Sequence, residues 1–145
     1  MKAVAFVLTL FFTSSVFGQN HAEDIKAVIN TLFMSMKDAD SIGVQSVFMP
    51  EAIMQTIVSR PGSENIVRHE SVSRFAGSIG KQKKGALNEE IEFETIKVDP
   101  PLAFVWTPYR FYFNGSFSHS GVNTFCLVQT SLGWKIQYII DTRKK

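Results

Sequence analysis

The chain has 145 residues, of which 45% are hydrophobic, with 15 basic and 13 acidic side chains and a formal net charge of +2. This length makes one domain with a core of its own, and the near-neutral charge excludes a nucleic-acid-binding footprint. The three His residues are isolated, Cys126 is the only Cys, and no glycine-rich phosphate loop occurs. The sequence therefore predicts no metal site, no disulfide and no bound cofactor.

The beginning of the chain has the pattern of a secretory signal peptide. It reads MKAVAFVLTLFFTSSVFGQN, with one Lys, an apolar run from Ala3 to Phe12, and the small residue Gly18 before the predicted cut. The run is too short to span a bilayer, which takes roughly 20 apolar residues. We therefore expect residues 1–18 to be removed, residues 19–145 to form a single domain, and the product to be periplasmic or secreted without membrane contact.

Three amphipathic helices are predicted in the first half of the chain. The first covers about residues 22–38, where apolar side chains recur at steps of three and four. A short second helix follows, with Asp40 or Ser41 as its cap, and it stops at Pro50. The third covers about residues 70–79, after a strand over EAIMQTIVSR and a turn over RPGSEN.

From residue 87 onwards the hydrophobic period changes to two. In LNEEIEFETIKV, Leu87, Ile91 and Phe93 alternate with Asn88 and three glutamates, so the acidic face is predicted to be wet, and the pattern slips near Thr95. Three more strands are expected over PPLAFVWTPYRFYF, SFSHSGVNTFCLVQT and WKIQYIID. Helices followed by long antiparallel strands predict an α+β fold with the helices on one face of a curved sheet.

The element order and the segments AFVWTPYRFYFNG and GVNTF...VQTSLGWKIQYIIDTRK resemble the nuclear transport factor two-like (NTF2-like) superfamily. Within it the chain is most similar to the SnoaL-like and putative lumazine-binding group of secreted bacterial proteins. The resemblance implies a cone-shaped, curved antiparallel or mixed sheet with three N-terminal-half helices on its concave face. It also implies a pocket at the wide end and, often, a homodimer through the outer sheet. The superfamily contains enzymes and non-enzymes, so the resemblance implies no reaction.

Strand parity places two polar residues toward the concave side. Phe125 and Leu127 are expected to face the core, and counting back by twos puts Asn123, His119 and Phe117 on the same face. A His and an Asn among aromatic side chains are typical of a small-molecule site, which has apolar walls and a few polar groups. For His119, an exposed or capping position near the strand end is the alternative.

Two further strands are expected to contribute aromatic side chains. Pro108 cannot donate to the sheet and predicts a phase shift, which would turn both Trp106 and Tyr109 inward. In the last strand Tyr138 shares the parity of Trp134, which we expect in the core. The predicted ligand-binding residues are thus Trp106, Tyr109, His119, Asn123 and Tyr138, with core or dimer surface as the alternative for Trp106 and Tyr109.

Three functional classes fit these residues. The first is an exported module that binds an unidentified small, partly apolar molecule. The second is an isomerase, dehydratase or cyclase that uses His119 as its acid or base, although no inward carboxylate or orienting partner is evident. The third is a dimeric interaction protein with a vestigial pocket. The classes differ in whether the cone is open and polar at its base or filled by Phe33, Met36 and Phe75.

Overall fold

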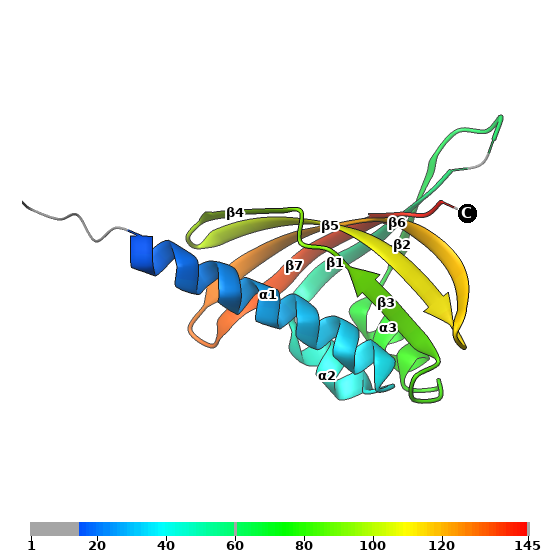
Figure 1. The fold of residues 1–145 in the computed structure, drawn as a ribbon, viewed down its shortest axis with the longest axis horizontal. Helices are drawn as coiled ribbons and strands as arrows, with labels where there is room; N and C mark the ends of the chain where they lie inside the picture. The colour runs from blue at the N-terminus through cyan, green and yellow to red at the C-terminus, as the bar shows by residue number, and fades with distance from the viewer. Residues whose placement is uncertain (1–14, 60, 145) are drawn as a thin grey trace, which may run out of the picture.

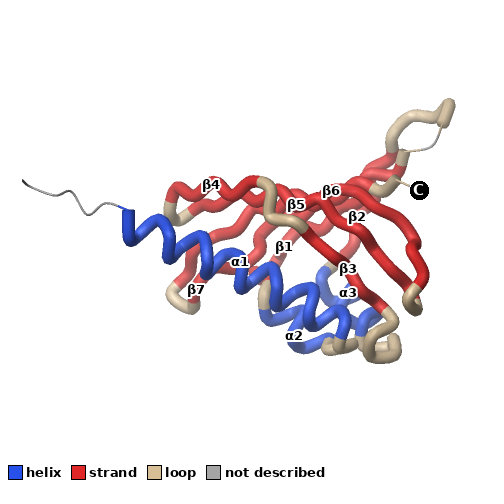
Figure 2. The backbone as a smooth tube through the Cα atoms, viewed as in Figure 1, coloured by secondary structure: helices blue, strands red, loops and turns tan. Residues whose placement is uncertain are grey.

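A computed structural model describes residues 15–59 and 61–144 of the chain. It contains three helices and seven strands (Figures 1 and 2). The helices are α1 (Ser15–Lys37), α2 (Ser41–Ser46) and α3 (Val72–Ile79). The strands are β1 (Phe48–Val58), β2 (Ile66–Glu70), β3 (Leu87–Ile91), β4 (Thr95–Asp99), β5 (Leu102–Phe113), β6 (Ser116–Thr130) and β7 (Gly133–Thr142). The predicted signal peptide lies largely outside the described residues.

All seven strands belong to one curved, mixed sheet in the order β2-β1-β7-β6-β5-β3, and β4 pairs with the other half of β5. Every neighbouring pair is antiparallel except β1 and β7, which run parallel. In Figure 1 the sheet arches over α1, and α2 and α3 lie together beneath one end of the arch. This arrangement confirms the predicted α+β class, with three helices against the concave face of the sheet.

Side-chain caps mark the starts of α2 and α3, whereas α1 covers Ser15–Lys37 and so extends beyond the predicted start at about residue 22. The Asp40 side chain caps α2 by accepting hydrogen bonds from the backbone N–H groups of Ile42 and Gly43 at 3.0 and 2.9 Å. Ser71 caps α3 in the same way through the N–H of Arg74. The third helix therefore starts at Val72 rather than at residue 70. Residues 66–70, for which no element was predicted before the helix, form the edge strand β2.

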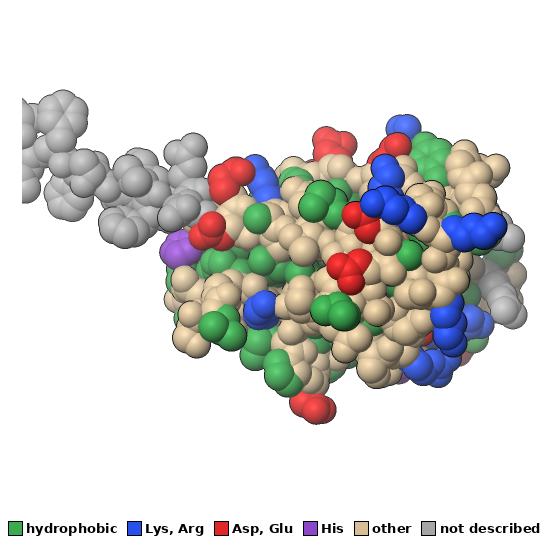
Figure 3. Space-filling view, turned by 90° about the horizontal axis from the view of Figure 1, so that it is seen from below, with side chains coloured by type: hydrophobic (Ala, Val, Ile, Leu, Met, Phe, Trp, Pro, Cys, Tyr) green, Lys and Arg blue, Asp and Glu red, His purple; other side chains and the backbone are tan. Residues whose placement is uncertain are grey.

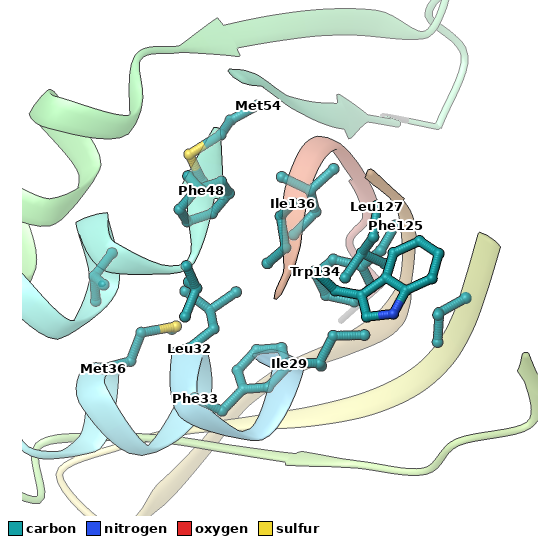
Figure 4. Packing of buried hydrophobic residues seen from close by; sticks show 14 of the residues in the cluster. Ile29, Leu32, Phe33, Met36, Phe48, Met54, Phe125, Leu127, Trp134 and Ile136 are labelled. Atoms are coloured by element: carbon teal, nitrogen blue, oxygen red, sulfur yellow. The ribbon is translucent and has the colours of Figure 1, made fainter. Parts of the chain in front are cut away.

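The hydrophobic core fills the space between α1 and the central strands (Figure 4). Ile29 and Leu32 of α1 are fully buried against Phe125 of β6 and Ile136 of β7. Trp134 is buried as predicted, with 3% of its surface exposed. Its indole nitrogen has no hydrogen-bond partner among the described residues, so packing alone stabilises this side chain. The core borders a pocket, because Leu32, Phe33 and Met36 belong to the core and also line that pocket.

The slip predicted near Thr95 is a local irregularity with one extra residue, since residues 92–94 lie opposite residues 107–108 of β5 between the pairings of β3 with residues 109–113 and of β4 with residues 102–106. The N–H groups of Glu92 and Glu94 still donate to the backbone oxygens of Pro108 and Trp106 at 3.0 and 3.2 Å. At the other end of β5 a bulge at Ser118 shifts the register opposite Phe111 and Tyr112. Phe117 therefore leaves the face of His119 and is 54% exposed, against the prediction from parity.

Candidate functional site

A pocket of about 660 Å³ opens between the concave face of the sheet and helices α1 and α3. Ten lining residues are apolar: Leu32, Phe33, Met36, Phe75 and Ile79 come from α1 and α3 and form the apolar wall, and Met54, Val58, Leu87, Phe111 and Ile139 come from the sheet. The remaining lining is polar and comes mainly from the sheet and the mouth. Phe33, Met36 and Phe75 line the pocket without filling it, so the interior of the cone is open and polar at its base.

A row of polar residues crosses the concave face at the level of the pocket. Arg68 on β2 is the cross-strand partner of Thr56 on β1, and Thr56 is the partner of Asp141 on β7. Asp141 pairs in turn with Asn123 on β6, which pairs with Thr107 on β5. Because directly paired residues project from the same face of a sheet, the row is a consequence of register. Thr107, at its inner end, is fully buried in the core.

Glu89 is the carboxylate that the sequence analysis did not find on the inner face. The Asn123 side-chain amide donates a hydrogen bond to its Oε1 at 2.7 Å. The pKa of Glu89 is raised from 4.5 to about 7, chiefly because burial disfavours the charged form. The hydrogen bond from Asn123 and the charge of Arg143 oppose this shift, and the charge of Asp141 adds to it. Parity already contained the signal, because Glu89 lies between Leu87 and Ile91 at a step of two.

Tyr109 is fixed beside the polar row by two hydrogen bonds. Its hydroxyl lies 2.9 Å from the backbone oxygen of Thr142 and 3.2 Å from Asp141 Oδ2, and both can accept from it. Gly121 permits this approach, since a Cβ there would lie 1.9 Å from the Thr142 oxygen and 3.0 Å from the Tyr109 ring. Burial and the nearby carboxylates raise the pKa of Tyr109, so the phenol stays protonated at neutral pH.

Asp141 and Arg143 bring a charged pair to the same wall. The Arg143 Nε donates to Asp141 Oδ2 at 3.1 Å, and the Thr56 hydroxyl donates to Asp141 Oδ1 at 2.5 Å. Asp141 and Arg143 thus form a local ion pair. It also lies in the pocket, where it places one compensated carboxylate within the electrostatic reach of Glu89 and Tyr109.

His119 lines the pocket beside two aromatic rings. Its ring centre lies 5.8 Å from that of Tyr109 in a perpendicular arrangement and 5.0 Å from that of Phe111. Its Nδ1 lies 3.0 Å from the Ser118 hydroxyl. Burial and the charge of Arg143 lower the pKa of His119, and the charge of Asp141 opposes them. The lowered pKa favours a neutral imidazole at pH 7.

The comparisons with known proteins identify the fold. No protein-family model matches the chain, and no curated protein matches it significantly in sequence. Among solved structures, an NTF2-like protein of unknown function from Shewanella baltica is 13% identical, with a TM-score of 0.69 over 91% of this chain and 99% of that one. An NTF2-like protein with a cystatin-like fold from Novosphingobium aromaticivorans is 13% identical, with a TM-score of 0.65 over 88% and 84%. The chain has the NTF2-like fold.

A third structure extends the likeness to proteins described by the cystatin-like fold alone. It is a domain of unknown function from Nostoc punctiforme, 17% identical, with a TM-score of 0.68 over 87% of this chain and 78% of that one. At these identities the likeness concerns the NTF2-like fold and carries no ligand or reaction. The function must therefore be argued from the site itself.

Within the NTF2-like cone the structure brings Tyr109, His119 and Asn123 together in the pocket but leaves Trp106 outside it. The phase shift predicted at Pro108 does not occur, because β5 and β6 pair without interruption from Leu102 to Phe111. Trp106 therefore keeps the parity opposite to Tyr109. It lies on the convex face with 38% of its surface exposed, so the expectation that it turns inward was wrong.

Tyr138 also lies outside the pocket, for a different reason. Cys126 pairs with Tyr138 while the next residue, Leu127, pairs with Ile136, so Gln137 forms a bulge that reverses the parity of the rest of β7. Tyr138 turns to the convex side, where its hydroxyl donates to Gln55 Oε1 at 2.5 Å. The same bulge turns Ile139 and Asp141 inward and so supplies the pocket with its second carboxylate.

Other types of site find no support in the part of the chain that the structure describes. Among residues 15–59 and 61–144, no three His, Cys, Asp or Glu side chains gather as metal ligands would. No helix in these ranges is long and apolar enough to cross a membrane. Cys126 is half-buried, and burial raises the pKa of its thiol, which disfavours the reactive thiolate.

Proposed function

We propose that this domain binds a small, partly apolar molecule in the pocket between the sheet and helices α1 and α3. The observation that carries the proposal is an open pocket of about 660 Å³ with an apolar wall and a polar base. Small-molecule sites have volumes of roughly 300–1,000 Å³ and combine these two kinds of surface. An open base also argues against a vestigial pocket, in which core side chains would occupy this space.

The base of the pocket supports recognition of a hydroxyl or carbonyl group on the ligand. Near pH 7 Glu89 is divided between its acid and carboxylate forms, so it can donate to such a group or accept from it. His119, with its neutral imidazole, adds a second polar contact from the neighbouring wall. Asn123 holds the Glu89 carboxyl group in place through the 2.7 Å hydrogen bond. These three side chains are thus the proposed polar recognition groups for the ligand.

Native mass spectrometry of protein isolated from the cells that produce it tests the proposal. Wild-type protein should carry a noncovalent mass excess of one small molecule. Ser78→Trp should carry none, because Ser78 lies on the exposed surface of α3 at the pocket lining and an indole there obstructs the pocket. Ser73→Trp is the matched control on the same helix, outside this pocket. An equal mass excess on all three proteins would contradict the proposal, as would its absence from the wild type.

Acid–base catalysis is a second candidate function, favoured by one observation. A carboxyl group whose pKa is about 7 is suited to proton transfer at neutral pH, and Glu89 meets this condition within the pocket. The side-chain amide of Asn123 orients the Glu89 carboxyl group through the 2.7 Å hydrogen bond. The test is deuterium incorporation at carbon in the retained molecule, incubated in D₂O with wild type or Glu89→Gln. Equal incorporation with both proteins, or none with either, would reject this function.

We also propose that the domain is exported and forms a homodimer, as the resemblance to the SnoaL-like and putative lumazine-binding group implies. Support for export is the signal pattern of residues 1–18. Support for a dimer is the convex face of the sheet, where Ile53, Leu102 and Trp106 are between 38% and 53% exposed. Large apolar side chains exposed on one face of a sheet are a common feature of interfaces, and a second copy with the same face would cover them.

A further inference from the structure

Two arginines line the mouth of the pocket without a partner among the residues that the structure describes. Arg68 lies on edge strand β2, and Arg74 lies in the first turn of α3. Both are exposed, and neither guanidinium forms an ion pair or a hydrogen bond with residues 15–59 or 61–144. Arg143, the third arginine of the lining, differs because its Nε donates to Asp141 at 3.1 Å and one of its Nη atoms lies 3.5 Å from the Thr56 hydroxyl. The mouth therefore offers two free guanidinium groups from two different elements.

From this arrangement we infer that the ligand is an amphipathic organic anion whose carboxylate or similar group binds between Arg68 and Arg74. This inference rests on the proposed function, since it assumes that the same pocket is occupied. A guanidinium group presents five N–H donors in a planar fork that matches a carboxylate or sulfonate. The apolar wall from α1 and α3 begins beside Arg74, at Phe75 and Ile79, and it provides the surface for the body of the molecule.

The polar row gives the expected length of this ligand. Arg68 and Asn123 lie in the same row, on strands separated by three strand spacings. At roughly 4.8 Å per spacing, their backbones are on the order of 14 Å apart. A molecule with its anionic group at Arg68 can thus reach the Glu89–Asn123 pair with a second polar group, once the inward reach of the side chains is allowed for. A small inorganic anion bound at Arg68 would not reach the Glu89–Asn123 pair.

The other charges around the pocket do not cancel the two arginines. Asp141 is compensated by Arg143 at 3.1 Å, and Glu89 lies at the base with its hydrogen bond to Asn123. Glu70, at the end of β2, is the acid of the mouth, and it makes no ion pair with a described residue. In the space-filling view of Figure 3, most visible Lys and Arg side chains lie toward the end away from the start of α1. An anion is therefore attracted to this end of the domain.

A matched pair of fluorescent probes tests the inference. 8-Anilinonaphthalene-1-sulfonate is an amphipathic anion, and N-phenyl-1-naphthylamine is its neutral counterpart without the sulfonate. The fluorescence that comes from the pocket is the part that is lost in Ser78→Trp and kept in Ser73→Trp. A probe bound to the convex face would fluoresce equally with both variants. Wild-type protein should bind the anionic probe at least tenfold more tightly than the neutral one, and decanoate should displace it better than decanol.

The arginine variants then locate the anion. Arg68→Gln with Arg74→Gln should weaken the anionic probe at least tenfold and change the neutral probe less than twofold, whereas Glu70→Gln should strengthen the anionic probe. Arg110→Gln with Lys97→Gln is the control with the same loss of two charges, because both residues are exposed on strands outside the pocket lining. Equal affinity of wild type and the double variant for the anionic probe overturns the inference but leaves the pocket proposal intact. Failure of both probes to bind the pocket overturns the two together.

Discussion

The raised pKa of Glu89 makes the stability of this domain depend on pH, and Glu89→Gln should remove that dependence. Between pH 4.5 and about 7 the folded protein keeps a proton on Glu89 that the unfolded chain has released. Because the folded state binds more protons in this window, the free energy of unfolding falls as pH rises through it. A shift from 4.5 to about 7 corresponds to at most about 3.5 kcal/mol at about 1.4 kcal/mol per pKa unit. Water in the open pocket reduces this value.

Glutamine preserves the acceptor that Asn123 uses at 2.7 Å but does not titrate, so the substitution isolates the proton. The measurement is urea unfolding followed by Trp fluorescence at intervals from pH 5 to pH 8, with Glu90→Gln as the exposed neighbouring control. The lowered pKa of His119 has the opposite effect. The free energy of unfolding decreases as the pH falls below the ordinary pKa of histidine, because the unfolded chain then binds the proton more readily. Because His119 is present in both proteins, its contribution cancels when the free energy of unfolding of Glu89→Gln is subtracted from that of the wild type. If the two proteins lose stability in parallel as pH rises, Glu89 ionises normally and the reasoning about its burial is refuted.

The remaining predictions concern the core, the convex face and export. Trp134→Ala should lower the free energy of unfolding by roughly 3–5 kcal/mol, because it empties a buried site; a loss below 1 kcal/mol in denaturant melts would contradict this. Light scattering at tens of micromolar should give a dimer for wild type and a monomer for Trp106→Asp, and a monomeric wild type would end the dimer proposal. The intact mass of exported protein should begin at Gln19, and recovery of full-length chain only from the cytoplasm would oppose export.

Local patterns in the sequence were sufficient for the fold class and for part of the site. The three- and four-residue steps of α1 and the caps at Asp40 and Ser71 involve residues that lie within one or two helical turns of each other. The parity of β6 placed His119 and Asn123 in the pocket because it could be counted from Phe125, which is fully buried. The parity of β3 also places Glu89 on the inner face, together with Leu87 and Ile91. It was missed because the other glutamates of this segment alternate with the apolar residues and were assigned to the outer face.

The sequence alone thus determined the order of elements, the amphipathic faces and the inward pair on β6, because each depends on residues that are close along the chain. The tertiary structure decided where strand parity breaks. The bulge at Gln137 turned Tyr138 outward and Asp141 inward, and uninterrupted pairing at Pro108 kept Trp106 on the convex face. Such shifts depend on the register of the neighbouring strand, which is set by contacts distant in sequence. The raised pKa of Glu89 has the same origin, since it depends on burial beneath the assembled cone.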